Sequence, residues 1–238
     1  FSPDNEDNAE IIHSVVFDGE LNGNWMASFS HASGNANANN GVQVWQVDQD
    51  SDMWLNWDEN DPRRSFTVYT EYLTKDGETR SVFDTGRPYP AYGKYNAPNE
   101  VALNRCPINV IVYRYADVLL MYAEALSQAN GGPTVEAYDA VNRVIRRGYK
   151  VPMDQPSEFD VAAGLDATAF RDRIILERSL ELVVEGKRAF DLLRTNTLIE
   201  KLTALGKNIR PGTNLLPIPQ AELDANEALS DTDQNAGY

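Results

Sequence analysis

Three glutamates recur at every fourth position late in the chain, at Glu177, Glu181 and Glu185. On a helix this spacing places them on one face, where paired carboxylates could perform general acid and base chemistry. Cations interleave the same stretch at helical spacing and could instead hold the carboxylates in ion pairs and charge-assisted hydrogen bonds. They are Arg173, Arg178, Lys187, Arg188 and Arg194. We favour the structural role over catalysis.

A second acidic group has the spacing of a calcium loop. Asp48, Asp50, Asp52 and Glu59 match positions 1, 3, 5 and 12 of the EF-hand loop, which supply oxygen ligands. Met53 stands where the sharp turn of that loop requires glycine, so a standard EF-hand is not expected. The sequence predicts a solvated acidic loop, with a looser calcium site over these four residues as the alternative and no other cofactor.

Aromatic residues gather among amides and carboxylates in the first 105 residues, which contain all four tryptophans. An aromatic ring can cover the apolar face of a pyranose, while neighbouring polar groups satisfy the hydroxyls of the sugar. Any single tryptophan could equally be a core residue, because Trp45 alternates with Val44 and Val47 as in a half-buried strand. The candidate ligand-binding residues, with the first two favoured, are Trp25, Trp54, Trp57, Trp45, Asn39 and Tyr92.

Composition and missing motifs exclude several classes of function. With 21 Lys and Arg against 36 Asp and Glu, the net charge of -15 argues against nucleic acid and favours neutral ligands. His13 and His31 accompany no nucleophile or zinc motif, and no phosphate-binding glycine loop opens a helix. Cys106 is the single cysteine, which excludes an internal disulfide and predicts a buried thiol.

These residues are expected to lie on two regions that meet near Cys106. Residues 1–105 read as loop-rich, with strands or extended segments expected at 42–47 and 66–69. They form the candidate ligand-binding surface. Residues 106–238 read as helical.

Apolar periodicity predicts the helices of the second region. One helix runs from Tyr115 and stops at Asn130, and a second starts at an N-cap on Thr134 and runs to Gly148; together they have the length of one tetratricopeptide unit. A third helix is expected to start from an N-cap at Thr168 and to run through Val183. Gly186 is expected to weaken the helical pattern. A short helix over 198–205 precedes an irregular tail.

Several segments resemble the SusD/RagB family in order and spacing. The helix that starts Arg114-Tyr115-Ala116-Asp117-Val118 resembles the signature of that family, and residues 177–194 resemble its ER-x-x-EL-x-x-EG-x-R-x-x-DL-x-R block. Residues 10–15 and 61–63, together with the tail segments 216–219 and 234–238, are also similar, although Ala236 replaces the usual proline.

The resemblance implies a mainly α, SusD-like fold in which tetratricopeptide-type helix pairs pack against a loop-rich ligand-binding region with a few short strands. It also implies a non-enzymatic lipoprotein on the surface of the outer membrane, which binds oligo- or polysaccharides and delivers them to a SusC-like TonB-dependent transporter. The chain begins without a signal peptide, so we expect it to be the C-terminal half, whose missing N-terminal half is a partner and carries the lipid anchor.

Three alternatives remain open at this point. A RagB-type relative would bind peptides, through backbone pairing and charge. A glycoside hydrolase would use two carboxylates, such as Asp58 and Glu59, beside the aromatic loops. A helix-repeat adaptor would bind a partner protein, although such proteins need more helix pairs than the single pair predicted in this chain.

Overall fold

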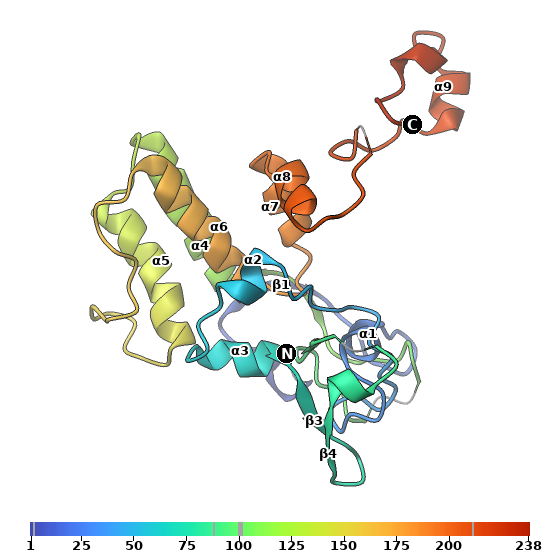
Figure 1. Cartoon of the computed structure of the whole chain (residues 1–238), viewed down its shortest axis with the longest axis vertical. Coiled ribbons are helices and arrows are strands. Elements are labelled where there is room, and N and C mark those ends of the chain that lie inside the picture. Colours follow the sequence, from blue (N-terminus) through green and yellow to red (C-terminus); the bar gives the residue numbers. More distant parts are fainter. Residues whose placement is uncertain (2, 88, 100–101, 211) are drawn as a thin grey trace. The chain divides into compact units, whose positions relative to one another are not determined.

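The chain folds as two compact units, Phe1–Lys187 and Arg188–Tyr238 (Figure 1). This computed structural model describes residues 1, 3–87, 89–99, 102–210 and 212–238, and for Pro3 and Asp52 the backbone alone. The predicted boundary near residue 105, between a loop-rich and a helical region, falls inside the first unit. A separate ligand-binding region over residues 1–105 therefore stays a prediction.

Three helices lie side by side in the first unit (Figure 1): α4 (Tyr115–Ala129), α5 (Val135–Gly148) and α6 (Ala167–Glu181). The periodic apolar positions of the sequence meet between them, and the expected helix pair is confirmed in α4 and α5. The buried residues of this core are Ala116, Leu120, Ala123, Ala137, Ala140, Val141, Val144, Ile145, Phe170 and Ile174.

The ends of these helices follow local hydrogen bonding. The hydroxyl of Thr134 accepts from the amide of Ala137 at 3.1 Å, as predicted for an N-cap. The prediction of Thr168 as the cap of α6 is wrong, because Asp166 accepts from the amide of Ala169 at 2.8 Å and starts the helix two residues earlier. The helix also ends sooner than predicted, at Glu181.

The strands described in the first unit form three antiparallel pairs, each of two strands. They are β1 (Ile11–Val15) with β6 (Val110–Arg114), β2 (Val68–Tyr69) with β5 (Ala91–Tyr92), and β3 (Glu71–Leu73) with β4 (Thr79–Ser81). None of these pairs builds an extended sheet, so loops and short helices make up most of this region.

Neither of the two runs expected as strands or extended segments is a strand over its full length. Residues 42–47 form no strand, because Gln43 adopts a φ of 46° and turns the chain. Residues 66–69 are divided between α3 (Pro62–Thr67) and β2. Asp61 caps α3 by accepting from the amide of Arg63 at 2.9 Å, and Pro62 suits the first helical position.

The remaining short elements of the first unit are α1 (Met26–Ser30), α2 (Asp52–Leu55), and the 3-10 turns Pro3–Asn5 and Val82–Asp84. Cys106 is buried with Ala27, Tyr95 and Ile108 around it. The predicted buried thiol is thus confirmed, and its contribution is apolar packing.

The second unit contains α7 (Arg188–Arg194), α8 (Leu198–Ala204), α9 (Gln220–Ala225) and the 3-10 turn Asp231–Asp233. The two tail segments that resembled a family pattern bind each other here. The side chain of Gln234 accepts from the amide of Ile218 at 2.8 Å and donates to its carbonyl at 2.9 Å. The side-chain amide of Asn235 donates to the carbonyl of Leu216 at 2.7 Å.

In the part of the chain that the structure describes, no helix combines the length and the apolar character needed to cross a membrane.

Candidate functional site

Two of the predicted tryptophans lie in one row of aromatic rings, Trp25–Phe29–Trp45, which we call the aromatic row. Trp25 immediately precedes α1 and Phe29 lies one turn later, so both side chains occupy the same side of the helix. Their ring centroids are 5.0 Å apart, and the ring of Trp45 meets Phe29 edge-on at 5.7 Å. Phe29 was not among the predicted site residues, although its spacing of four from Trp25 could have indicated it.

Backbone hydrogen bonds hold the segment that carries Trp45 against α1. The amides of Val42, Gln43 and Trp45 donate to the carbonyls of residues 28, 31 and 29, at 2.8, 2.9 and 3.0 Å. A Cβ at Gly41 would lie 2.4 Å from the carbonyl oxygen of residue 32, so only glycine allows this approach. The row is therefore set by backbone contacts rather than by mobile side chains.

The aromatic row is accessible, and the segment that carries it contains no charged residue. Trp25 is 44% exposed and Val44 is 43% exposed beside Trp45, while Phe29 and Trp45 are half-buried. Residues 21–47 contain no Asp, Glu, Lys or Arg. Within this stretch His31 is fully buried, and burial lowers its pKa to about 4, so it is neutral at pH 7. Rings in such a setting can stack on an apolar face of a ligand.

The other predicted aromatic residues lie in a separate core cluster with Val47, Val68, Leu180 and Val183. Trp57 is only 3% exposed, and its indole nitrogen donates to Asp61 at 3.1 Å, so its ring is part of the core. Trp54 is half-buried under the guanidinium of Arg64, 4.5 Å from the ring centroid.

Tyr92 belongs to the same cluster and is also half-buried. Burial raises the pKa of its phenol to about 12. The structure therefore separates Trp54, Trp57 and Tyr92 from the aromatic row, and we leave them out of the candidate site.

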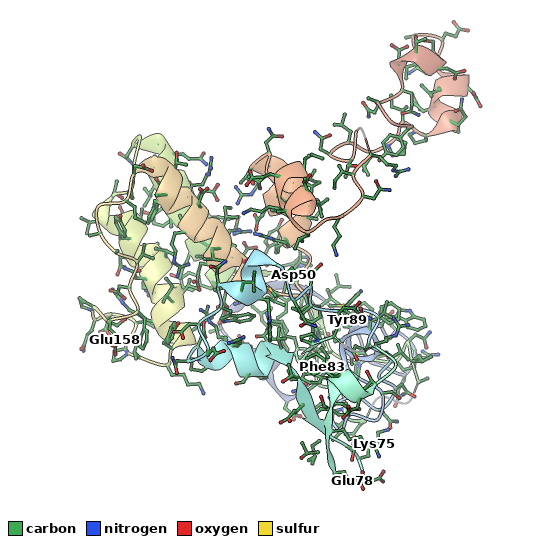
Figure 2. The ribbon with its side chains drawn as sticks, viewed as in Figure 1. Asp50, Lys75, Glu78, Phe83, Tyr89 and Glu158 are labelled. Atoms are coloured by element: carbon green, nitrogen blue, oxygen red, sulfur yellow. The ribbon has the colours of Figure 1, made fainter. Side chains whose placement is uncertain are left out.

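Asn39 is exposed and is held by Lys75 at the end of the β3–β4 hairpin (Figure 2). The amine of Lys75 donates to the carbonyl of Asn39 at 2.8 Å and also to its side-chain oxygen. The side-chain oxygen of Asn39 is thus already engaged by a cation.

The acidic loop does not converge on a metal site. Asp50 is exposed (Figure 2), while the carboxylate of Asp48 accepts from the amide of Asp50 at 3.1 Å. Glu59 is 88% exposed and pairs with Arg64 at 3.3 Å. The side chain of Asp52 lies outside the described residues. Among the described side chains, no group of three His, Cys, Asp or Glu is placed to hold a metal ion.

The carboxylates suggested for hydrolysis lie on the surface. Asp58 accepts from the amide of Asn60 at 2.9 Å and from the hydroxyl of Tyr149 at 2.7 Å, and these bonds lower its pKa. A general acid needs a raised pKa, so Asp58 is poorly suited to protonate a leaving group. The carboxylate of Glu59 also lies on the surface, since its side chain is 88% exposed.

The glutamates at every fourth position are buried in an ion-pair network. Glu177 accepts from Arg63 at 2.6 Å, and Glu181 binds Arg63 at 2.8 Å and Arg114 at 2.5 Å. Burial alone would raise the pKa of Glu181, but Arg114, Arg147 and Arg63 together bring it well below its usual range. Glu181 therefore stays charged, and both carboxylates are engaged in ion pairs, which supports the structural role.

Lys94 joins this network from the loop-rich region and was not singled out in the sequence. It is 3% exposed, and its amine donates to Glu185 at 2.7 Å and to the carbonyl of Glu181 at 2.9 Å. Arg114 binds the same Glu185 at 2.8 Å. The network therefore ties residues 63 and 94 to the end of α6, and it fixes the loop-rich region on the helices.

A cavity of about 460 Å³ lies on one side of the network. Its charged lining includes Glu10, Arg63, Lys94, Arg114, Arg147 and Glu181. These groups already pair with one another, for example Arg114 with Glu10 at 2.7 Å. None of the predicted ligand-binding residues lines this cavity, so the aromatic row is the better candidate for the site.

Comparison with known sequences identifies the family of this mainly helical protein. A model of the SusD family matches residues 4–238. SusD-like protein P25 of Formosa agariphila is 31% identical over 288 residues, which cover 100% of this chain and 51% of that protein. The chain belongs to the SusD family, as its signature segments predicted. It spans about half the length of the curated relatives that it matches.

Solved structures confirm the predicted SusD-like fold. A SusD homologue from Bacteroides thetaiotaomicron shares 25% identity with a TM-score of 0.72, covering 96% of this chain and 52% of that chain. Surface glycan-binding protein A from Bacteroides uniformis also shares 25% identity, with a TM-score of 0.60, and 98% of this chain covers 50% of that one. The helix pair packed on a loop-rich region is thus the architecture of these proteins.

Proposed function

We propose that the protein binds neutral oligo- or polysaccharides without transforming them, through the aromatic row Trp25–Phe29–Trp45. The observation that carries this proposal is a row of packed, partly exposed rings on a segment that contains no charged residue, in a chain of the SusD family. The rings supply stacking surface for the C–H faces of a pyranose. A family relative of similar fold is a surface glycan-binding protein, which supports the same ligand class.

The charge distribution favours a neutral glycan over a peptide. Peptide sites of known types use strand pairing, charged clamps or an apolar groove. Here the segments that carry the row have no ionised side chain, and the amides of 42, 43 and 45 are already used by α1. The adjoining sequence also contains Asn22 and Asn40, whose side-chain amides are of the kind that suits hydroxyl groups.

The place of action follows from the family rather than from the site. We propose that the protein works at the cell surface, on the outer membrane, as a lipoprotein whose anchor belongs to the N-terminal half. There it would hand the bound glycan to a SusC-like TonB-dependent transporter. Pull-down of the lipidated full-length protein with its transporter from solubilised outer membranes tests both points together.

The test of glycan binding is isothermal titration of the full-length protein against neutral oligosaccharides, with uronate-bearing oligosaccharides and peptides as comparison ligands. Each hit is then titrated into Trp25→Ala and Trp45→Ala. Phe83→Ala is the matched control, because Phe83 is 46% exposed but lies outside the row (Figure 2).

We expect a neutral glycan to bind, and each variant of the row to weaken binding about two- to tenfold, since stacking on one ring is worth roughly 0.5–1.5 kcal/mol. The Phe83→Ala protein should bind like the wild type. Binding of peptides alone, or glycan binding that survives both tryptophan substitutions, would contradict the proposal. Release of new reducing ends would show an enzyme instead.

A further inference from the structure

Tyr89 differs from the other tyrosines of the loop-rich region. It lies on the loop between β4 and β5 (Figure 2) and is 45% exposed. Among the described residues, its hydroxyl makes no hydrogen bond. The hydroxyls of the other four tyrosines in residues 1–105 all bond to protein groups, and they are Tyr69, Tyr72, Tyr92 and Tyr95. Both the ring and the hydroxyl of Tyr89 are therefore available to a ligand.

Two hydrogen bonds place the segment that carries Tyr89 against the segment that carries Trp45. The side-chain amide of Gln43 donates to the carbonyl of Tyr89 at 2.7 Å, and the amide of Val47 donates to the carbonyl of Pro90 at 3.1 Å. Backbone segments joined by such an amide-to-carbonyl bond lie about 5 Å apart. Residues 42–47 thus join α1, which carries the start of the aromatic row, to the loop that carries Tyr89.

The loop of Tyr89 is held by its own hydrogen bonds. The hydroxyl of Thr85 donates to the carbonyl of Val82 at 2.7 Å and accepts from the amide of Arg87 at 3.1 Å. The amide of Tyr89 donates to the carbonyl of Arg87 at 2.8 Å. Pro90 follows directly and restricts the backbone of Tyr89 to extended conformations. A side chain on such an ordered loop loses little conformational entropy when a ligand binds.

Exposed apolar side chains lead from the aromatic row to this loop. Trp25 is 44% exposed before α1, Val44 is 43% exposed beside Trp45, and Tyr89 is 45% exposed on the loop bonded to that segment. The ring centroids within the row are 5.0 and 5.7 Å apart, a spacing close to the advance of one pyranose unit per ring. A short oligosaccharide therefore covers the row but does not extend past Val44.

We infer that Tyr89 extends the glycan site beyond the aromatic row, so that the protein prefers a long neutral oligosaccharide over a short one. This inference rests on the proposed function of the row. A longer chain continues across Val44 to Tyr89, where the ring stacks on the C–H face of a further sugar and the hydroxyl bonds to one of its hydroxyls.

Titration of the full-length protein with ligands of graded length tests this inference. The probes are size-fractionated neutral oligosaccharides of glucose, mannose, xylose and galactose, from disaccharide to octasaccharide. In each series that binds, the quantity compared is the affinity for the octasaccharide divided by the affinity for the trisaccharide. We expect Tyr89→Ala to lower this ratio about two- to tenfold, which is the worth of one stacked ring. Trp25→Ala should weaken the binding of both lengths.

Two further variants separate the ring from the loop. Phe83→Ala is the matched control, because Phe83 is 46% exposed and lies in the turn that begins the same loop, and it should leave the ratio at its wild-type value. Tyr89→Phe keeps the ring and loses only the hydroxyl, so it should retain most of the preference for the octasaccharide.

Nitration of the wild-type protein gives a measurement without any substitution. Tetranitromethane modifies exposed tyrosines, and mass spectrometry follows each site. Saturating octasaccharide should remove most of the reactivity of Tyr89, whereas saturating trisaccharide should not. Tyr113 on β6 is equally exposed at 45% and should react alike with and without either ligand.

The outcomes separate this inference from the proposed function. An unchanged ratio in Tyr89→Ala, equal weakening of both lengths by that variant, or equal protection of Tyr89 by both ligands would overturn the inference and leave the function of the row intact. A wild-type protein that binds trisaccharide and octasaccharide equally well would do the same. Absence of binding at every length would overturn the proposed function and the inference with it.

Discussion

Removing one carboxylate from the buried network should destabilise the protein far more than removing an exposed one. Glu185 is the carboxylate to change, because its side chain is 1% exposed and it binds Lys94 at 2.7 Å and Arg114 at 2.8 Å. Glu185→Gln keeps the size and one acceptor oxygen but removes the charge. Arg114 retains Glu10 and Glu181, whereas the amine of Lys94 keeps only neutral acceptors within hydrogen-bond distance.

The expected magnitude follows from this geometry. At an effective dielectric constant of about 20, two unit charges 2.7 Å apart attract by about 6 kcal/mol. Burial opposes charge at the same place and lowers the pKa of Lys94, while Glu185 raises it. Removal of one partner from a buried pair typically costs about 3–5 kcal/mol. In the Glu185→Gln protein, we expect either that Lys94 loses its proton or that the free energy of unfolding falls by about 3–5 kcal/mol.

The assay is urea unfolding at pH 7, followed by far-UV circular dichroism. The matched control is Glu59→Gln, since Glu59 is 88% exposed and its pair with Arg64 should contribute at most about 1 kcal/mol. Lys94→Met in the Glu185→Gln background should recover part of the loss, because no unpaired cation then remains. A Glu185→Gln protein as stable as Glu59→Gln, or strictly additive effects in the double variant, would refute the reasoning.

Three further predictions concern stability. Folding lowers the pKa of His31 from 6.5 to about 4, so the unfolded state binds the proton more strongly. The free energy of unfolding should therefore fall by up to about 3 kcal/mol as the pH drops from 6.5 to 4. In unfolding measured across this pH range, His31→Gln should remove that dependence. Asp166→Ala should cost about 1 kcal/mol in urea unfolding and Thr168→Ala almost nothing, because only Asp166 caps α6, and equal effects would contradict the assigned cap. Gly93→Ala should cost about 1–3 kcal/mol because its Cβ would lie 2.2 Å from a backbone oxygen, while Gly86→Ala meets nothing within 4 Å and should melt like the wild type.

Much of the helical architecture was predictable because it depends on neighbours in sequence. The periodicity of α4 and α5 and the cap at Thr134 were read correctly, since the contacts that form them span three or four residues. The error at Thr168 had a local cause as well, because Asp166 competes for the same unsatisfied amides. The signature segments were sufficient to place the chain in its family.

The loop-rich region was less predictable, because its backbone is set by distant contacts. The alternation around Trp45 indicated a strand, but the amides of residues 42, 43 and 45 bond to carbonyls of residues 28–31 at α1, and Gln43 turns the chain. Alternation alone cannot show whether a partner strand is present. Lys94 likewise carried no sequence signal, because its carboxylate partner lies 91 residues away.

For the candidate site, the sequence alone determined its composition: aromatic rings among amides in a stretch without charge. Which rings are available was decided only by the tertiary structure. Trp57 and Trp25 are the same residue type in similar polar company, yet Trp57 is 3% exposed and Trp25 is 44% exposed. The physical reason is that burial is a property of the surfaces that pack together, and Leu180 and Val183, which share the core cluster of Trp57, come from a distant part of the chain.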